Sequence, residues 1–320
     1  MVDIRVAYPL ASSCNADYSS RTLGASQEIV DTRYQMVAFD LDGTLLQSNR
    51  RISDSTVEYL QSLDRRGLKL AFCTGRSSRS TYEHIQKLGL SRPFPVVCTN
   101  GAKGIFCNLD QRAECPREDM VFHKPLSREI TSCAIQNAKK LNYVSMLYYD
   151  DAVYANESCE EHFTLTRLYM RLARSNVTHV EDNFESLMDE FGMPSRIVVL
   201  FLNASIEDVL ASFETELGRE ATIIPGSKGW FLEILNSNKG RGLRDMCHHM
   251  DVPLEKCIAL GDGENDVEFL TMAGLGICMK NGTESAKRAA RAITEWTNNE
   301  DGVIRALQQL ERLGLLRLDN

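Results

Sequence analysis

The chain has 320 residues, of which 43% are hydrophobic, and a formal net charge of −8. This length allows a large buried core in one or two domains, and the lack of a basic block argues against a nucleic-acid-binding surface. The sequence contains no run of 18 apolar residues, so we expect no membrane-spanning helix.

Residues 1–33 lack the long apolar stretch of a secretory signal, and we expect a mobile extension, with a targeting segment as the alternative. The 10 cysteines form no C-x-x-C pair, and several lie inside apolar runs. This usage indicates small buried thiols in a reducing compartment, which favours a cytoplasmic location.

The first folded stretch alternates between apolar runs and amphipathic segments. Strands are expected at 34–40, 68–73 and 95–99, and helices between them. The first helix begins after Ser53, a residue type that favours helix N-caps, and the second covers 79–88. The order strand, helix, strand, helix, strand predicts a parallel sheet.

The same alternation returns near the C-terminus. The expected helices and strands are 239–250, 256–260, 265–272, 275–278, 284–290 and 301–313. Between these two halves the pattern differs, because short strands mix with helices at 160–172 and 206–217 and a hairpin turns at Asp150-Asp151.

We therefore predict an α/β fold, with a Rossmann-like parallel-sheet core interrupted by an inserted α+β cap domain. The expected division is an N-terminal extension at 1–33, a discontinuous core at 34–101 and 229–313, a cap at 102–228 and a tail at 314–320.

Polar clusters end the predicted core strands or begin the helices that follow. They are Asp40-Leu-Asp42-Gly-Thr44, Thr74-Gly-Arg76, Lys239 and Gly261-Asp-Gly-Glu-Asn-Asp266. In parallel α/β sheets ligands bind at the carboxyl ends of the strands, so these clusters are expected to converge.

Paired carboxylates suggest a metal and a phosphate at this edge. Asp40 and Asp42 would face the same side of an ideal strand, and with Asp262 they offer oxygen ligands suited to Mg²⁺. Phosphoryl transfer needs positioning and charge neutralisation. Thr74, Lys239 and backbone N–H groups near Gly43 and Gly75 are the candidates for that task.

Residues 34–310 resemble a haloacid dehalogenase (HAD) superfamily phosphatase of the Cof type, with a large cap of type C2 (IIB-like). The motifs that carry the resemblance are FDLDGTLL at 39–46, CTGR at 73–76, Lys239 in NSNKGRGL and LGDGENDVEFL at 260–270. The stretches Thr99–Ala102 and FLEILNSNKG resemble the entry to the cap and the return from it.

The resemblance implies a role for each motif residue. Asp40 would be the nucleophile and a Mg²⁺ ligand, and Lys239 would bridge it to the phosphate. Asp42 would be the acid/base and give the metal its backbone carbonyl. An acid at this position favours phosphatase over dehalogenase chemistry.

The remaining implied roles concern the phosphoryl group and the metal. Thr74 would bind the phosphoryl group and Asn265 would lie beside it. Asp262 would bind Mg²⁺, and Asp266 would orient the metal's ligands and water. Arg76 is left open between a functional contact and a surface charge, and the hairpin Tyr148–Asp151 is interpreted as solvated rather than substrate-binding.

The predicted function is a Mg²⁺-dependent phosphatase that hydrolyses small phosphorylated metabolites, sugar phosphates foremost, through a phospho-aspartate on Asp40. A sugar phosphomutase of similar fold and a non-catalytic phospho-ligand sensor are the alternatives. No nucleic-acid or membrane partner is expected, and the sequence does not predict the individual substrate, the oligomeric state or regulation.

Overall fold

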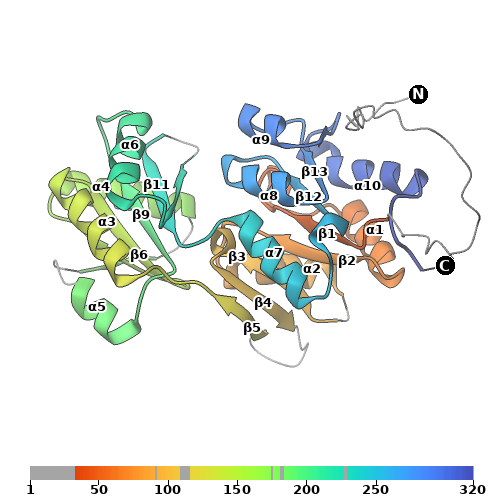
Figure 1. The fold of residues 1–320 in the computed structure, drawn as a ribbon, viewed down its shortest axis with the longest axis horizontal. Coiled ribbons are helices and arrows are strands. Elements are labelled where there is room, and N and C mark those ends of the chain that lie inside the picture. Colours follow the sequence, from red (N-terminus) through yellow and green to blue (C-terminus); the bar gives the residue numbers. More distant parts are fainter. Residues whose placement is uncertain are drawn as a thin grey trace, which may run out of the picture.

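The structure is a computed structural model that describes residues 33–90, 92–108, 116–173, 176–180, 184–226 and 229–319. These residues form two lobes, here called the core lobe and the cap lobe, joined by two connections (Figure 1). The expected N-terminal extension lies outside the described residues, apart from Arg33.

The described part of the core lobe is built on an eight-stranded sheet in the order β14-β13-β12-β1-β2-β3-β4-β5. Six of its strands run parallel, and β4 and β5 are antiparallel to their neighbours. The strands are β1 (Met36–Phe39), β2 (Lys69–Cys73), β3 (Phe94–Cys98), β4 (Lys103–Asn108), β5 (Arg117–His123), β12 (Cys257–Gly261), β13 (Leu275–Cys278) and β14 (Ala292–Ile293). The predicted α/β fold with a parallel-sheet core is confirmed.

Helices cover both faces of this sheet (Figure 1). They are α1 (Asp54–Arg65), α2 (Tyr82–Leu88), α7 (Lys239–His249), α8 (Val267–Met272), α9 (Glu284–Ala289) and α10 (Gly302–Arg312). Alternate residues of β1 pack on opposite layers. Val37 and Phe39 join the cluster with α1, α2 and α10, whereas Met36 and Ala38 join the cluster with α7 and α8. Burial on both faces explains why the strand sequences are continuously apolar.

Local signals fix the helix ends close to where the sequence predicts them. The Ser53 hydroxyl accepts a hydrogen bond from the Thr56 N–H at 3.2 Å and caps α1. Gly89 adopts a left-handed φ of 59° and ends α2, as the lack of a Cβ allows. The helix expected at 79–88 begins as a 3₁₀ turn, Arg79–Thr81, before continuing as α2.

The cap lobe, as far as it is described, contains a six-stranded sheet in the order β10-β11-β9-β6-β7-β8. Its strands are β6 (Val144–Tyr149), β7 (Ala152–Asn156), β8 (Thr178–His179), β9 (Arg196–Leu200), β10 (Thr222–Pro225) and β11 (Phe231–Leu235). Its helices are α3 (Arg128–Lys140), α4 (Glu160–Ala173), α5 (Phe184–Phe191) and α6 (Ile206–Leu217). Residues of α3, α5 and α6 share one hydrophobic cluster with the sheet, and residues of α4 share the other.

The chain changes sheets later than the expected crossings near residues 102 and 229. A turn at Thr99–Gly101 reverses the chain after β3, so that β4 and β5 extend the core sheet as far as His123. On the return, β11 pairs with β9 as far as Ile234 and with β10 as far as Leu235, both in the cap sheet. Strand pairing therefore puts the two connections after His123 and after Leu235.

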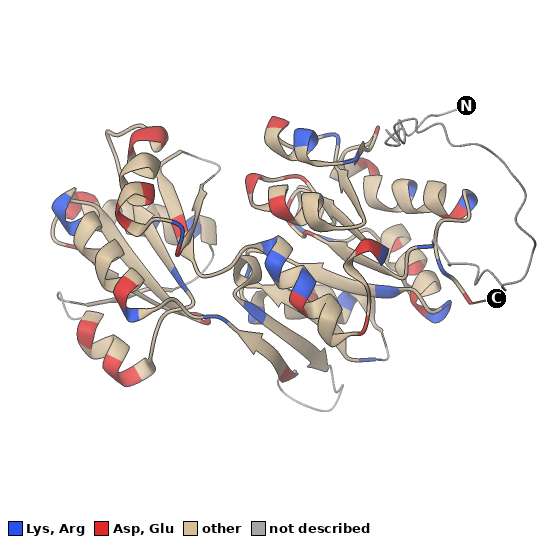
Figure 2. Cartoon of the chain, viewed as in Figure 1, with Lys and Arg blue, Asp and Glu red and all other residues tan. Residues whose placement is uncertain are grey.

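The C-terminal residues pack against the core lobe. Leu316 is buried and forms an isolated parallel bridge with Tyr34 at the start of the core. Acidic and basic residues are spread over the helices of both lobes (Figure 2). Within the described ranges, no helix combines the length and apolar character needed to cross a bilayer.

Candidate active site

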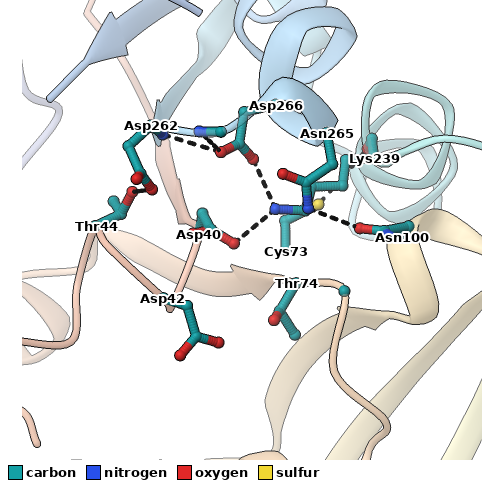
Figure 3. A network of polar contacts seen from close by, with 12 residues as sticks. Asp40, Asp42, Thr44, Cys73, Thr74, Asn100, Lys239, Asp262, Asn265 and Asp266 are labelled. Atoms are coloured by element: carbon teal, nitrogen blue, oxygen red, sulfur yellow. Dashed lines mark hydrogen bonds and ion pairs between the residues drawn. The ribbon is translucent and has the colours of Figure 1, made fainter. Parts of the chain in front are cut away.

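The structure brings the predicted polar clusters together at the carboxyl edge of the core sheet (Figure 3). Asp40 follows β1, Thr74 follows β2 and Asp262 follows β12, while Lys239 begins α7. Backbone pairing explains the convergence, because β1 lies between β2 and β12 in parallel register. Strands that start from distant parts of the chain thus end side by side.

Lys239 links two carboxylates at the centre of the site. Its Nζ lies 2.6 Å from Asp40 Oδ1 and 2.6 Å from Asp266 Oδ1. The Lys239 and Asp266 side chains are fully buried. Burial alone would lower the pKa of Lys239, but the Asp266 and Asp40 carboxylates outweigh it and raise that pKa. The site therefore holds a fixed cation.

Asp266 also shapes the loop that carries Asp262. Its second oxygen, Oδ2, accepts hydrogen bonds from the backbone N–H groups of Asp262 and Gly263, each at 2.9 Å. The Thr44 hydroxyl donates to Asp262 Oδ1 at 2.8 Å. Burial and the neighbouring Asp266 charge raise the pKa of Asp262 to about 7.

The donor set fits a hard divalent cation. Carboxylate oxygens of Asp40, Asp262 and Asp266 lie within 4.8 Å of one another. Burial also raises the pKa of Asp40, and Lys239 opposes this effect. The neighbouring Asp266 and Asp262 charges raise this pKa further, because like charges in a buried site disfavour ionisation. Oxygen ligands are those that Mg²⁺ prefers. The residues present are thus suited to Mg²⁺.

Gly43 makes room for this arrangement. It has a φ of +81°, and a Cβ there would lie 2.3 Å from Asp262 Oδ2. A side chain at this position would be strained and would displace the Asp262 carboxylate. The glycine thus lets the loop after β1 approach the loop after β12.

Arg76, whose role the sequence left open, binds Asp42 through two hydrogen bonds. Arg76 Nε donates to Asp42 Oδ2 at 2.6 Å, and Nη2 donates to Oδ1 at 2.7 Å. Burial would raise the pKa of Asp42, but the hydrogen bonds and charge of Arg76 outweigh it and lower that pKa. In Figure 3 the Asp42 carboxylate lies apart from the group around Lys239.

The residues expected to hold a phosphoryl group lie on adjacent loops. Thr74 is buried, and its Oγ1 accepts the N–H of Arg76 at 3.2 Å. Asn265 Nδ2 donates to Asn100 Oδ1 at 2.9 Å. A Cβ on Gly75 would lie 2.9 Å from the same Asn100 oxygen. The sequence did not predict a site role for Asn100, although the Thr99–Ala102 stretch resembles the entry to the cap.

The cap hairpin is solvated at its turn, where Asp150 and Asp151 are exposed as predicted, but not at Tyr148 on its first strand. The Tyr148 side chain is buried, so the solvated interpretation is wrong for this residue. Asp150, at the turn, accepts a hydrogen bond from Lys103 Nζ of the core at 3.0 Å. The sequence of this polar turn did not indicate that it contacts the core lobe.

Fold and site together define a class of hydrolase, and a family model confirms it. The model described as haloacid dehalogenase-like hydrolase matches residues 37–307. The chain belongs to this family. The predicted enzyme class, a phosphoric monoester hydrolase of this family, is confirmed by relatives named as phosphatases.

Similar proteins match over nearly their full length. A Bacillus subtilis protein named 5-amino-6-(5-phospho-D-ribitylamino)uracil phosphatase YitU is 30% identical over 293 residues, which are 88% of this chain and 98% of the relative. The crystal structure of TM0651 from Thermotoga maritima has 27% identity and a TM-score of 0.67, covering 86% of this chain and 97% of that one. BT1666 from Bacteroides thetaiotaomicron has 20% identity and a TM-score of 0.72, covering 93% and 100%, and shows a similar fold.

Proposed function

We propose that this chain is a Mg²⁺-dependent phosphatase that hydrolyses small phosphorylated metabolites, sugar phosphates foremost, through a phospho-aspartate on Asp40. The observation that carries the proposal is the buried Lys239 ammonium, 2.6 Å from Asp40 Oδ1 at the carboxyl edge of the sheet. It orients the nucleophile and offsets the charge of an incoming phosphate.

In the first step, Asp40 Oδ attacks phosphorus and the bond from phosphorus to the leaving oxygen breaks. Asp42 gives a proton to that oxygen, which departs as an alcohol. Thr74 and backbone N–H groups beside Gly43 and Gly75 bind the phosphoryl oxygens. For this step Asp42 must carry a proton and turn from Arg76 toward the substrate, because pairing with Arg76 lowers its pKa.

In the second step, Asp42 takes a proton from a water molecule, whose oxygen attacks the phosphorus of phospho-Asp40. The bond from phosphorus to the Asp40 oxygen breaks, inorganic phosphate leaves and Asp40 is restored. Lys239 remains paired with Asp266 throughout, so the site keeps its cation after the Asp40 charge is esterified.

Asp40, Asp262 and the backbone carbonyl of Asp42 would hold Mg²⁺, with Asp266 orienting its surroundings. When bound, the ion would neutralise charge on the phosphoryl oxygens and on Asp40. Asp266 already fixes the Asp262 loop through two backbone hydrogen bonds, which keeps the proposed ligands in place.

The names of two relatives support a small phosphorylated substrate. One is the YitU phosphatase of Bacillus subtilis, named for a phospho-ribityl compound. The other is the HMP-PP phosphatase of Yersinia pestis, 25% identical over 263 residues. A cytoplasmic location also forms part of the proposal, and the cysteines among the described residues are all free thiols, as a reducing compartment requires.

The test is phosphate release from a panel of sugar phosphates, the phospho-ribityl compound, nucleotides and pyridoxal phosphate, each with Mg²⁺ and with EDTA. We expect Mg²⁺-dependent release concentrated on a few compounds. Loss of substrate without free phosphate would favour a mutase. Binding of a compound with no turnover, together with no phosphate trapped on Asp40, would contradict the proposal and favour a sensor.

A further inference from the structure

The turn that follows β3 is conformationally unusual. Thr99, Asn100 and Gly101 have positive φ values of 50°, 48° and 93°. A Cβ on Gly101 would lie 2.0 Å from the Asn238 backbone oxygen, so the turn packs directly against the start of α7. Left-handed conformations at two successive non-glycine residues are rare and persist only when surrounding contacts enforce them. The contacts made by Asn100 are therefore informative.

Asn100 is buried and touches three separate parts of the protein. Its backbone N–H donates to the Thr74 carbonyl at 3.0 Å. Its Oδ1 accepts from Asn265 Nδ2 at 2.9 Å, as Figure 3 shows, and its Nδ2 donates to Glu233 Oε2 at 2.9 Å. Glu233 belongs to β11 of the cap lobe. One residue thus joins both proposed phosphate-binding loops to the cap.

The Glu233 carboxylate is held in place by another cap residue. Arg196 Nη1, from β9, lies 3.2 and 3.1 Å from the two Glu233 oxygens. The same nitrogen donates to the Gly75 carbonyl at 3.3 Å, and the guanidinium lies 4.2 Å from the Tyr148 ring centroid. The side chains of Arg196 and Glu233 are only 11% and 13% exposed.

These partners determine the direction of every hydrogen bond in the series. A carboxylate only accepts, so Asn100 must turn its NH₂ group toward Glu233 and its carbonyl oxygen toward Asn265. Asn265 must then use one N–H for Asn100, which leaves its second N–H for another acceptor. The charge on the cap residue therefore fixes the orientation of an amide next to the proposed phosphoryl position.

We propose that Asn100 is a positioning residue that couples the cap lobe to the phosphoryl site. The series Arg196, Glu233, Asn100 and Asn265, here called the Asn100 series, orients Asn265 when the cap packs against the core as in this structure. The proposal rests on the proposed function, because Asn265 and Thr74 are phosphate-binding residues only under that function. It adds a reason for cap closure to raise activity even when the leaving group makes no cap contact.

The experiment exchanges the two groups that meet at the lobe boundary. Asn100→Asp puts two carboxylates face to face, and Glu233→Gln removes the charge that fixes the amide direction. In the double variant N100D/E233Q, the glutamine amide introduced on β11 can donate to the new carboxylate, which still accepts from Asn265. Aspartate is tolerated at positive φ better than most residues, so the turn is preserved.

The readouts are kcat and KM for para-nitrophenyl phosphate, whose small leaving group limits direct cap contacts. Each single variant is expected to lower kcat/KM roughly 10- to 100-fold, the range for losing a hydrogen bond to a charged group. The double variant is expected within about fivefold of the wild type, since partners in one network are not additive. A double variant as poor as the product of the singles, or singles with wild-type kcat/KM, would overturn the proposal.

Asp150→Asn is the matched control, because it also turns an acid into an amide at a contact between the lobes, outside the series. Its kcat/KM is expected within about threefold of the wild type, as for a half-exposed ion pair. A loss equal to that of Glu233→Gln would show a general effect of loosening the cap and would contradict the proposal.

Amide hydrogen exchange at residues 74–76 and 263–266 separates this proposal from the proposed function. Hydrogen exchange is expected to be faster in each single variant and to return to the wild-type rate in the double variant N100D/E233Q, whether or not phosphate is released. A wild-type protein that releases no phosphate would defeat the proposed function alone. If Asn100→Asp does not fold, Asn100→Gly suits the positive φ, and its effect should not multiply with that of Glu233→Gln.

Discussion

The Lys239–Asp266 pair of the strand-end site and the Lys103–Asp150 pair between the lobes differ in how far solvent reaches their charges. In the core, the Lys239 and Asp266 side chains are fully buried and paired. Between the lobes, Lys103 is buried but its cap partner Asp150 is 56% exposed. Buried pairs cost much to break because the remaining charge has no water, whereas exposed pairs are screened. Removing one partner is therefore expected to cost more free energy at the Lys239–Asp266 pair than at the Lys103–Asp150 pair.

The largest expected effect is that of Asp40→Asn. The variant should lower kcat by more than about 10⁴-fold, because an amide cannot replace the carboxylate nucleophile. The fold should remain intact, since Lys239 keeps its contact with Asp266. Phosphate release and thermal unfolding measure the two outcomes, with the exposed Asp151→Asn as control. Activity within tenfold of the wild type would rule out phospho-Asp40.

Lys239→Met tests the buried side of the comparison. It leaves Asp40 and Asp266 without their cation and should lower the free energy of unfolding by about 3–5 kcal/mol. The value of kcat should fall roughly 10²–10³-fold, as when one donor to a developing charge is removed.

Urea unfolding of Lys239→Met and of Lys103→Met makes the comparison direct. Removing Lys103 leaves two carboxylates, Glu118 and Asp150, that solvent can partly reach. Equal destabilisation of the two variants would break the contrast between core and boundary.

Gly43→Ala tests how tightly the two loops of the site approach. Strain at a φ of +81° should cost about 1–3 kcal/mol, and the added Cβ should push the Asp262 carboxylate aside. The Mg²⁺ concentration for half-maximal activity should therefore rise. Gly218→Ala is the control, because Gly218 has a φ of +60° and no atom within 4 Å of the added Cβ. A rise in the Mg²⁺ requirement in both variants would show that the effect does not come from contact between the added Cβ and Asp262.

Asp150→Asn has the smallest expected effect and tests the exposed side. The free energy of unfolding should change by less than about 1 kcal/mol, because the Asp150 side chain is half exposed. The change should shrink further in high salt, which screens exposed charges. Urea titrations at low and high ionic strength provide the measurement. A decrease in the free energy of unfolding close to that of Lys239→Met would show that the ion pair between the lobes contributes as much to stability as the pair in the core.

Sequence patterns predicted the core well because its signals are local. Apolar runs with turn residues gave the strands, and caps such as Ser53 gave the helix ends. The site followed from the same logic, since strands in parallel register end at one edge. The structure places Asp40, Lys239, Asp262 and Asp266 together there, as expected.

The boundary between the lobes was harder to predict because its contacts join residues far apart in sequence. Asn100 and Glu233 are 133 positions apart, and neither stands in a pattern that indicates its partner. Arg76 next to Asp42 is a similar case, separated by 34 positions. The strands β4 and β5 were not assigned to the core, because nothing in their sequence shows that the turn at Thr99–Gly101 folds them back onto β3.

The two connections between the lobes run next to each other, since the Asn236 side-chain amide donates to the Pro125 carbonyl at 3.0 Å. A unit that enters and leaves a fold at neighbouring points can be exchanged or resized without shifting the strands that flank it. Evolution or a protein engineer can thus replace the cap as a module. Such a replacement would change which substrates bind and leave the residues at the strand ends of the core unchanged.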